Sequence, residues 1–470
     1  KILSDFNFNY LPSNISFNTN IIRQYNRQQF RQVEVEGIGL DPLYRRNFAF
    51  NYQYGFNYNL TKSLKLNYTA SSSNIVKNYL NENNEPIDSF TIWDSYWDIG
   101  DPNNHTQQLV LNYEIPINKI PLFNFIKANY SYTGDYSWQR ASNALSEIEI
   151  GGTTYNLGNT IQNANSHNLN ATFNMDTFYS YLGLKKGKKP APKLKAIPKP
   201  GEKVVNTNVK TQNDNPFVGG LIGVLTSVKN MQVNYTQNNG TVLPGFTQGV
   251  GFLGSSKPTL GFIFGSQEDV RYEAAKNGWL TNYQEFNQNF TQVTNKTFKA
   301  TANVDLFPDF KIDLTLDRAY SENSSEQYRV DVLNGYIPQS PYTTGNFSIS
   351  TLLVKTAFST SDENASVAFD DFKANRMVVA NRLAQNFYGN AIIPRYGDSS
   401  NPIPTDTQDP KYNLYFANKG YPIGYGKNNQ AVLFPAFMAA YSGGNASSAS
   451  LGILRSFPIP NWAVKYNGLM

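Results

Sequence analysis

The chain lacks cysteine and is poor in histidine. None of its 470 residues is Cys, and only His105 and His167 can supply an imidazole. Disulfides, thiolate metal sites and nucleophilic cysteine chemistry are therefore excluded. The two histidines lie far apart in the sequence, and we expect each in a loop or at a strand edge rather than in a metal site. We expect no catalytic residue, no cofactor and no metal ion.

Charge and long apolar runs are also scarce. Charged residues make up 16% of the chain, against about 25% in a typical soluble domain. The net charge of +5 is small for this length, which predicts no nucleic-acid partner. Mean hydropathy is -0.46, and no apolar run approaches the roughly 20 residues of a transmembrane helix. The sequence shows no signal-peptide pattern at Lys1, and we interpret it as an internal fragment of a longer polypeptide.

Aromatic residues are abundant, and they alternate with polar ones. The clearest segment is residues 47–60, NFAFNYQYGFNYNL, in which every even position is aromatic or Leu and the odd positions carry mostly Asn and Gln. A two-residue period over fourteen residues predicts a β-strand with two chemically opposite faces. A second alternating segment begins after Thr61-Lys62-Ser63, which predicts a hairpin with a tight turn.

The same pattern recurs along the chain and predicts about twelve antiparallel strands. Short turns near residues 12, 62, 116–121 and 308 are expected to alternate with long connections. The long connections are expected at about 28–45, 71–105, 137–166, 236–295 and 320–344. Short turns on one side and long loops on the other are typical of outer-membrane barrels.

The composition of the two faces favours a membrane barrel over a soluble core. Core faces of soluble β proteins favour tightly packed Val, Ile and Leu, whereas Tyr and Phe dominate here. Aromatic side chains suit the membrane interfaces, and uncharged polar ones suit a water-filled lumen. The residues predicted to face lipid are Phe48, Phe50, Tyr52, Tyr54, Phe56, Tyr58, Leu64, Leu66 and Tyr68. Those predicted to face the lumen are Asn47, Asn51, Gln53, Asn57, Asn59, Lys65 and Asn67.

Two segments break the alternation. Lys185–Lys203 is rich in Lys and Pro, which predicts an extended linker or a tether for an anionic partner. Within 359–461, Phe369–Leu383 has helical spacing, with Ser361, Asp362 or Asn364 as the expected N-cap, and Val432–Tyr441 is expected to form a second helix. Catalysis by Asp370-Asp371 is not expected, because adjacent helical residues point in different directions.

The fold prediction is therefore all-β, a segment of a very large transmembrane β-barrel. Barrel strands with long extracellular loops are expected over 1–176 and 227–358. A Lys/Pro-rich periplasmic insertion is expected over 177–226, and a small, partly helical one over 359–461, beneath the wall. Residues 462–470 are expected to begin the next strand.

Five short motifs resemble the SprA/Sov family, the giant outer-membrane translocons of the type 9 secretion system of gliding and pathogenic Bacteroidota. They occur in this order: PSNISF (12–17), NGTVLPGF (239–246), ANRMVVANRLA (374–384), AVLFPAFMAAYSG (431–443) and FPIPNW (457–462). The resemblance runs along essentially the whole chain and implies a later part of a much longer protein. The insert at Lys185–Lys203 matches no family pattern, and family members are several times longer.

The resemblance implies a passive wall segment of a single-chain barrel of about 36 strands, the largest size known for such barrels. Its implied partners are the rest of the same barrel, outer-membrane lipid, a PorV-like shuttle barrel, a periplasmic plug protein and secreted proteins with type 9 C-terminal signal domains. Its implied place is the bacterial outer membrane, as an integral protein.

Two other functions remain open. A TonB-dependent-type transporter is also a large barrel, of about 22 strands, but it would carry a plug domain and an energy-coupling box, which are not found in this sequence. A surface adhesin or other structural β protein would need no detergent in solution. An enzyme is less favoured than either, because no paired carboxylates, triad or metal ligands occur at usable spacing.

Overall fold

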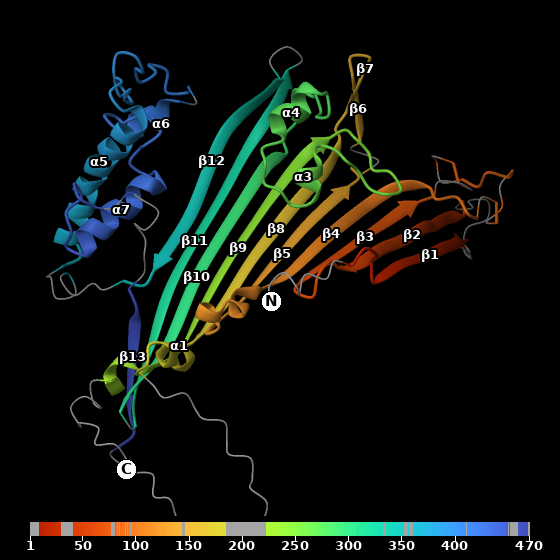
Figure 1. Cartoon of the computed structure of the whole chain (residues 1–470). Coiled ribbons are helices and arrows are strands. Elements are labelled where there is room, and N and C mark those ends of the chain that lie inside the picture. Colours follow the sequence, from red (N-terminus) through yellow and green to blue (C-terminus); the bar gives the residue numbers. More distant parts are fainter. Residues whose placement is uncertain are drawn as a thin grey trace, which may run out of the picture.

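The computed structural model shows a protein built mostly of β-strands, with few helices (Figure 1). It describes residues 9–468 apart from 30–40, 77–79, 82, 84, 90, 92, 95, 143–145, 185–221, 308, 332–334, 352–355, 357–360, 410, 450 and 452–458. Eleven strands form one antiparallel sheet, and two further strands form a separate hairpin. The predicted predominance of β-structure and the antiparallel pairing are confirmed.

The strands of the main sheet are long. They are β1 (Asn14–Gln28), β2 (Leu43–Asn59), β3 (Leu64–Ile75), β4 (Asp101–Ile115), β5 (Ile126–Gln139), β8 (Asn159–Asn174), β9 (Val228–Phe246), β10 (Asn289–Phe307), β11 (Phe310–Asp331), β12 (Gly335–Ile349) and β13 (Asn461–Tyr466). The separate hairpin is β6 (Glu147–Ile150) with β7 (Thr153–Asn156). The helices are η1 (Pro116–Lys119), η2 (Pro121–Phe123), α1 (Met175–Tyr181), α3 (Leu260–Ile263), α4 (Arg271–Lys276), α5 (Val367–Tyr388), α6 (Tyr412–Ala417) and α7 (Gln430–Tyr441).

Each strand pairs with the next one in the sheet, in the order β1-β2-β3-β4-β5-β8-β9-β10-β11-β12. β13 pairs with β11 on the lower part of that strand. The sheet is not closed: β1 lies at one end of it and β12 at the other. The chain therefore folds as a broad, open, up-and-down sheet.

The connections alternate between short and long, as the sequence predicts, with two differences. Residues 60–63, 116–125 and 308–309 form short connections, whereas 29–42, 76–100, 140–158 and 247–288 are long. The predicted long loop at 320–344 is wrong, because β11 runs on to Asp331 and β12 starts at Gly335. The predicted loop at 236–295 shortens to 247–288, because β9 and β10 extend farther than the apolar alternation.

The main buried cluster lies between the upper half of the sheet and the connection 247–288, which we call the covering segment. The covering segment contains α3 and α4 and lies in front of the strands in Figure 1. The cluster joins side chains of the strands to side chains of the covering segment, including Tyr136, Ile161, Leu243, Phe246, Phe262, Ile263, Ala274, Leu280, Phe290, Tyr328 and Tyr336.

The helical region after β12 is confirmed in content but not in position. α5 and α7 form where helical spacing predicts them, and the N-cap of α5 is Ser366 rather than Ser361, Asp362 or Asn364. The predicted place beneath the wall is wrong, because β12 and β13 both pair with β11 and the region leaves midway along that edge. The predicted position comes from counting strands, which assumes that every connection joins the ends of two strands. The helical region instead interrupts one strand midway along its length.

Two predictions fall wholly or partly outside the described residues. The Lys/Pro-rich segment Lys185–Lys203 lies outside them, so its role as a linker or tether stays a prediction. The barrel strands expected up to residue 358 end earlier, because β12 ends at Ile349, and residues 352–355 and 357–360 also lie outside the described part of the chain.

Candidate functional site

One face of the sheet is polar over its whole height. The seven residues predicted to face the lumen all lie on it, because the strand pairing places them in adjacent rows. Asn47, Gln53, Asn57, Asn59 and Lys65 are exposed there, and Asn51 and Asn67 are half-buried. We call this surface the polar face. One of its rows runs across seven strands, and it consists of Gln53, Ser71, Thr106, Ser137, Gln162, Val242 and Thr291.

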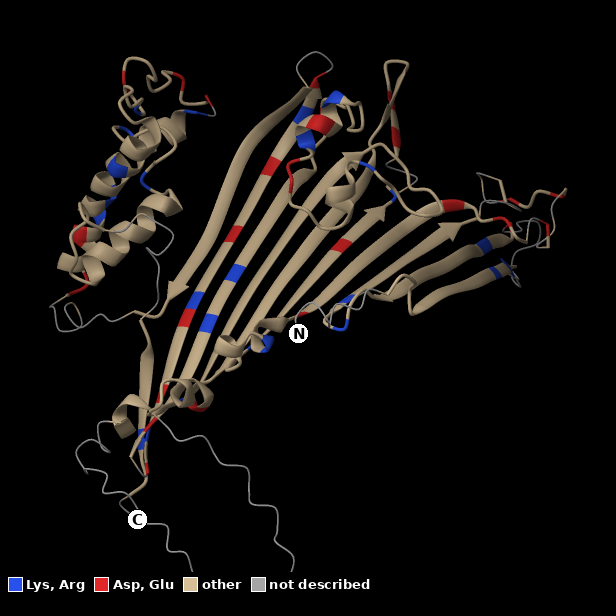
Figure 2. Ribbon diagram, viewed as in Figure 1, with Lys and Arg blue, Asp and Glu red and all other residues tan. Residues whose placement is uncertain are grey.

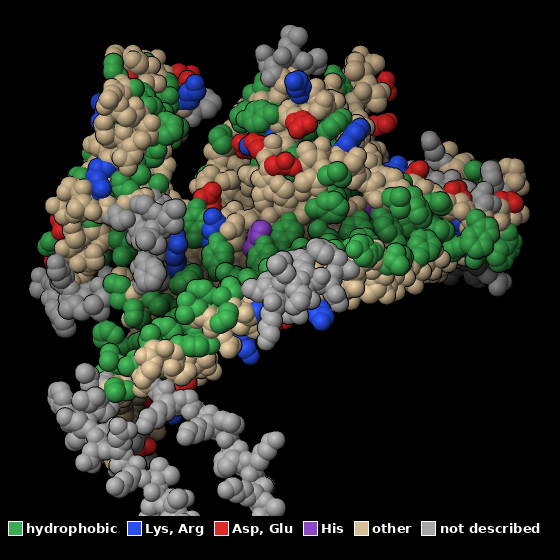
Figure 3. All heavy atoms as spheres, viewed as in Figure 1, with side chains coloured by type: hydrophobic (Ala, Val, Ile, Leu, Met, Phe, Trp, Pro, Cys, Tyr) green, Lys and Arg blue, Asp and Glu red, His purple; other side chains and the backbone are tan. Residues whose placement is uncertain are grey.

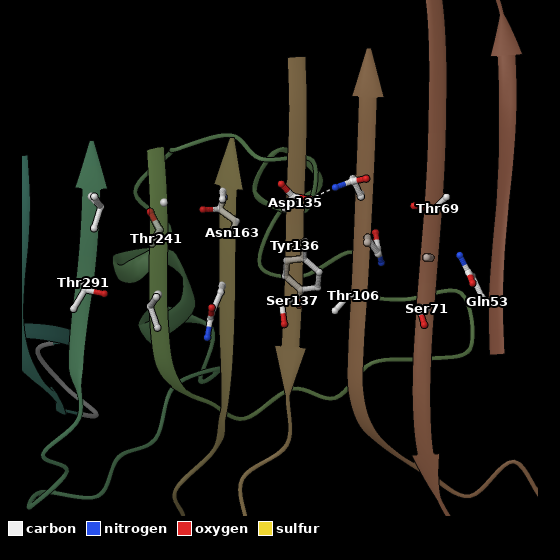
Figure 4. Close-up of a pocket in the computed structure, with 18 residues that line it drawn as sticks. Gln53, Thr69, Ser71, Thr106, Asp135, Tyr136, Ser137, Asn163, Thr241 and Thr291 are labelled. Atoms are coloured by element: carbon white, nitrogen blue, oxygen red, sulfur yellow. Dashed lines mark hydrogen bonds between the residues drawn. The ribbon is translucent and has the colours of Figure 1, made fainter. Parts of the chain in front are cut away.

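The polar face is hollowed in its upper half. A hollow of about 540 Å³ is lined by this row and its neighbours from β2 to β10. Figure 4 shows Gln53, Thr69, Ser71, Thr106 and Ser137 along its strands, with the covering segment on the far side of the sheet. A smaller hollow of about 350 Å³ lies on the same face lower down, around Lys65, Asn112 and Asn129. Both hollows show that the polar face is locally concave.

Amides and hydroxyls rather than charges dominate the polar face. Asp135 accepts a hydrogen bond from the Gln108 amide at 2.8 Å. Charged side chains concentrate toward β10, β11 and β13, where Lys465 pairs with Asp313 at 2.8 Å (Figure 2). Elsewhere the polar face carries many neutral hydrogen-bonding groups, which create no strong electrostatic field of either sign.

The opposite face, which we call the aromatic face, carries the residues predicted to face lipid. Phe56 is 37% exposed, and Tyr54, Tyr58, Leu64, Leu66 and Tyr68 are half-buried. No other strand layer packs on these side chains among the described residues. Their contact with lipid stays a prediction.

For Phe48, Phe50 and Tyr52 the prediction of lipid contact is wrong. They are 2%, 7% and 2% exposed, because other parts of the chain cover this end of β2. The Tyr52 ring stacks on Phe252 at 4.4 Å, and its hydroxyl donates to the Phe252 carbonyl at 2.9 Å. Arg23 lies over the Phe48 ring at 5.5 Å and donates to the Tyr96 carbonyl at 2.9 Å.

Below the covering segment, the aromatic face carries a continuous apolar belt. Figure 3 shows hydrophobic side chains gathered in an oblique band across this face. The rows of paired residues that make up the belt include Leu111, Tyr132, Tyr113, Tyr130, Leu169, Tyr235, Phe298, Ile115, Ala128, Ala171, Val233, Ala300, Leu316, Ile126, Phe173, Met231, Ala302, Leu314, Trp462, Val304, Ile312 and Val464. On β10 the belt runs from Phe298 to Phe307, about the length that a tilted membrane strand needs.

The upper limit of the belt is oblique to the strand rows. On β3 and β4 the apolar residues reach Tyr68 and Leu109, whereas the same row holds Asn165 on β8 and Asn239 on β9. Strands that tilt by about 35–45° in a membrane cross a horizontal interface at different points along their length. An oblique limit is the pattern that such a tilt produces.

A ladder of polar side chains marks this limit on β8 and β9. The Asn239 amide donates to Asn165 Oδ1 at 2.6 Å, and the Gln237 amide donates to Asn239 Oδ1 at 3.3 Å. The Tyr235 hydroxyl donates to Gln237 Oε1 at 2.8 Å. Beside them, His167 Nδ1 lies 2.8 Å from the Tyr130 hydroxyl. These groups satisfy one another where the apolar belt gives way to polar surroundings.

The covering segment binds the polar part of the aromatic face through backbone groups. The Asn163 amide donates to the carbonyls of Phe262 and Ser266 at 3.0 and 2.6 Å, and the Asn165 amide donates to the Gly265 carbonyl at 2.6 Å. At Gly134, an added Cβ would lie 2.2 Å from the Phe264 carbonyl oxygen. Only glycine allows that approach.

Both histidines lie within strands of the aromatic face, so their expected place in a loop or at a strand edge is wrong. His105 is fully buried beside Gln107, under the covering segment at Gly254. The alternation itself carries a signal of this cover. On the side expected to face lipid it turns polar at His105, Gln107, Asn163, Asn165 and Thr241.

An ionic cluster fastens the covering segment to the far strands. Arg271 pairs with Asp269 at 2.7 Å and with Glu326 of β11, and the Tyr336 hydroxyl donates to Glu326 at 2.6 Å. The hydrogen bond from Arg271 lowers the pKa of the Asp269 carboxyl, and the same contact raises the pKa of the guanidinium. Arg271 also lies 4.4 Å from the Phe290 ring centre. One side chain thus joins β10, β11, β12 and the covering segment.

Two further observations concern the described residues alone. None of their helices combines the length and the apolar character that crossing a membrane requires. Among them, no three His, Asp or Glu side chains come together as a metal site would need.

Comparisons with known proteins identify no family. No family model matches the sequence, and no curated protein matches it. The crystal structure of the ferric yersiniabactin uptake receptor FyuA from Yersinia pestis aligns with 71% of the chain at 9% identity and a TM-score of 0.22. The chain spans 38% of that receptor's length. At this identity and TM-score the likeness carries no argument about fold or function.

Proposed function

We propose that the chain is a wall segment of an outer-membrane channel that passes folded proteins. One observation carries the proposal: a single open sheet has a concave polar face and, opposite it, an oblique apolar belt. A closed barrel built from such strands puts water on one face and lipid on the other. The chain is then an integral outer-membrane protein with outer-membrane lipid as a partner.

The belt supports contact with lipid rather than with a protein core, because it is broad and no other layer of the described chain covers it. Trp462 and Val464 are 62% and 54% exposed, and Phe56 lies in the same band. Exposed apolar areas of this extent mark an interaction surface. The strand ladder satisfies the backbone groups of the belt, and the bilayer core demands that of any chain that crosses it.

The two free edges favour a larger wall. β1 and β12 each pair with one neighbour only among the described strands, and an unpaired edge cannot face the bilayer core. The remaining strands of the same barrel are the partners that would cover both edges. A wide barrel leaves an aqueous lumen, as in porins of 16 or more strands.

The side chains of the polar face favour the passive passage of a substrate over catalysis. Its neutral amides and hydroxyls bind water and offer neither an apolar patch nor a dense charge to retain a folded substrate. We therefore propose no catalytic role and no cofactor. The resemblance to SprA/Sov suggests type 9 secretion, with a PorV-like shuttle barrel, a periplasmic plug protein and cargo bearing type 9 C-terminal signal domains as partners.

Site-specific photocrosslinking tests the proposal in the intact membrane. A photoreactive amino acid at Thr69 lies on the polar face, and at Tyr68, one residue away, it lies on the aromatic face. During export, Thr69 should crosslink to a secreted protein that carries the C-terminal signal domain. The matched Tyr68 variant should crosslink to lipid and not to cargo.

Three outcomes would reject parts of this proposal. Recovery of the protein from the aqueous fraction without detergent would reject the membrane wall. A membrane-inserted protein that gives no cargo adduct at Thr69, while export continues, would reject the protein-conducting role and leave the wall intact. Cargo adducts at Tyr68 would reverse the assignment of the two faces.

A further inference from the structure

β12 and β13 are two parts of one edge strand. Both run antiparallel to β11, with Ile349 opposite Arg318 and Asn461 opposite Thr315. Ser350 continues the ladder by donating to the Asp317 carbonyl at 2.8 Å, and Ile459 donates back to the Ser350 carbonyl at 3.0 Å. The chain therefore leaves the strand after Ser350 and returns beside the point of departure.

The interruption falls at the upper limit of the apolar belt. Below it, the aromatic face of β11 carries Leu316, Leu314 and Ile312, and β13 adds Trp462 and Val464 in the same rows. Above it lie β12 and the polar part of the face. The inserted residues thus leave the wall where the belt ends.

The inserted residues fold around a core of their own, and we call α5, α6 and α7 with their connections the helical unit. Val379, Ala380, Val432 and Ala436 are fully buried between α5 and α7. Arg382 closes one end by donating to the carbonyls of Ala446 and Ala449 at 2.6 and 2.8 Å. The unit is therefore a compact body rather than an extended loop.

The helical unit leans over the aromatic face of β12 and leaves a hollow beneath it. The Phe434 ring lies 4.1 Å from the Phe347 ring, centre to centre. Beside this contact, a hollow of about 730 Å³ lies between α7 and the aromatic face of β12. Its walls are formed by Thr343, Gly345, Phe347, Ile349 and Glu322 on the sheet side and by Phe372, Asn429, Gln430, Leu433, Phe434 and Phe437 on the helix side.

The hollow adjoins the unpaired edge of β12. Within the described part of the chain β12 pairs with β11 alone, so its outer backbone groups have no strand partner. A strand that joined this edge would place every second side chain on the aromatic face. Those side chains would enter the hollow below Leu433 and Phe437, and one straight strand could pair with both β13 and β12.

We propose that the helical unit clasps the seam between β12 and the next strand of the same wall, with the apolar side chains of that strand packed beneath α7. This rests on the proposed wall function. Its chemistry is that of strand addition at an edge, where backbone hydrogen bonds give the pairing and side-chain pockets fix the register. The apolar lining from Phe372, Leu433 and Phe437 selects an aliphatic or aromatic side chain from the entering strand.

Thiol labelling tests the clasp, and the chain has no native cysteine that would react beside the introduced one. Thr343 and Thr344 both border the hollow, but strand alternation places the Thr343 side chain on the aromatic face, beside α7, and the Thr344 side chain on the polar face. Both residues are exposed in the present structure with α7 in place. In the assembled protein in outer membranes, Thr343→Cys should react with a water-soluble maleimide about tenfold more slowly than Thr344→Cys, because the packed strand must open first. Equal rates would overturn the proposal.

A second variant separates the clasp from the wall. Deleting residues 351–459 joins Ser350 to Pro460 and keeps every β13 residue opposite its present partner. The shortened protein should remain in the outer membrane, and Thr343→Cys should then react as fast as Thr344→Cys. Continued protection of Thr343→Cys would show that something other than the helical unit covers the seam. Loss of the unmodified parent from the membrane fraction would instead reject the wall itself.

Discussion

The upper and lower halves of the aromatic face carry the same alternation, but another segment of the described chain covers only the upper half. In the lower half, Leu111, Val233 and their neighbours form the apolar belt, and no part of the described chain covers it as a layer. In the upper half, the covering segment buries Tyr136 and Ile161 to 1% and 0% exposure. A two-residue period therefore identifies a face, whereas the chemistry at each position identifies what lies against it.

The two halves also differ in how they satisfy polar groups. The covered half contains Asn163 and Asn165, whose amides donate to carbonyls of the covering segment. The belt contains almost no such groups in its central rows. A bilayer offers no hydrogen-bond partners, whereas a protein segment does, so polar residues on the outward side mark protein contact.

Replacing Phe262 by Ala should release the covering segment. Phe262 is fully buried in the cluster between α3 and the upper strands, and truncating such a ring costs about 3–5 kcal/mol. Cleavage of residues 247–288 by an added protease should accelerate by about two to four orders of magnitude, while the barrel stays in the membrane. Leu260→Ala is the matched control, because Leu260 lies in the same helix and is 61% exposed. Equal cleavage of both variants would show that the cluster does not hold the segment.

A charge in the belt should destabilise the wall. Val233→Lys places an ammonium on the lipid side of β9 near the middle of the belt, at a cost of about 2–4 kcal/mol. Gln232→Lys adds the same charge on the exposed polar face one residue away and should change little. The free energy of unfolding in lipid vesicles, measured with urea, compares the two. Equal costs would mean that the aromatic face does not meet lipid.

The sequence predicts the fold class and the two faces well, because both depend on local alternation. The strand core of residues 47–59 and the polar row at Asn51, Gln53 and Asn57 follow from the two-residue period alone. The helical content of α5 and α7 follows from spacing in the same way. Local periodicity is enough for these features.

Contacts between distant segments lie beyond local periodicity. Phe252 stacks on Tyr52 although 200 positions separate the two residues in the sequence, and no local pattern near Tyr52 predicts this contact. The interrupted strand is hidden for a similar reason, since Ser350 and Ile459 meet only through pairing with β11. Only the polar positions on the outward side, at His105, Gln107, Asn163, Asn165 and Thr241, indicate protein cover there.

Arg271→Ala should loosen the covering segment less than the loss of Phe262. The guanidinium is 16% exposed and pairs with Asp269 and with Glu326, which is 12% exposed. Removing it leaves Glu326 partly buried without its cation, at a cost of about 2 kcal/mol, below the value for a fully buried pair. Protease cleavage within 247–288 should rise by about one order of magnitude. Arg271→Lys should rescue only part of the loss, because a single ammonium cannot serve both carboxylates in the same geometry.

The polar ladder at the limit of the belt should contribute a smaller amount. Asn239→Ala removes the amide that donates to Asn165 and the oxygen that accepts from Gln237, at a cost of about 1 kcal/mol. Asn238→Ala, on the exposed polar face, is the control and should be close to neutral. Urea unfolding in vesicles compares them. A larger cost at Asn238 would place the supported side of the strand on the other face.

The smallest effect should come from acid, through Asp269 alone. Its pKa is lowered in the folded protein by the hydrogen bond from Arg271, so its contribution is complete at neutral pH and is lost as the pH falls from the ordinary carboxyl value through the lowered one. Asp269→Asn should therefore be cleaved faster than the parent at pH 7, and the difference between the two should shrink as the pH falls below about 4. The side chain is 42% exposed, so solvent screening keeps this difference below that of Arg271→Ala. A difference that grew in acid would mean that the folded protein favours the protonated carboxyl, and the covering segment would then be held without this ion pair.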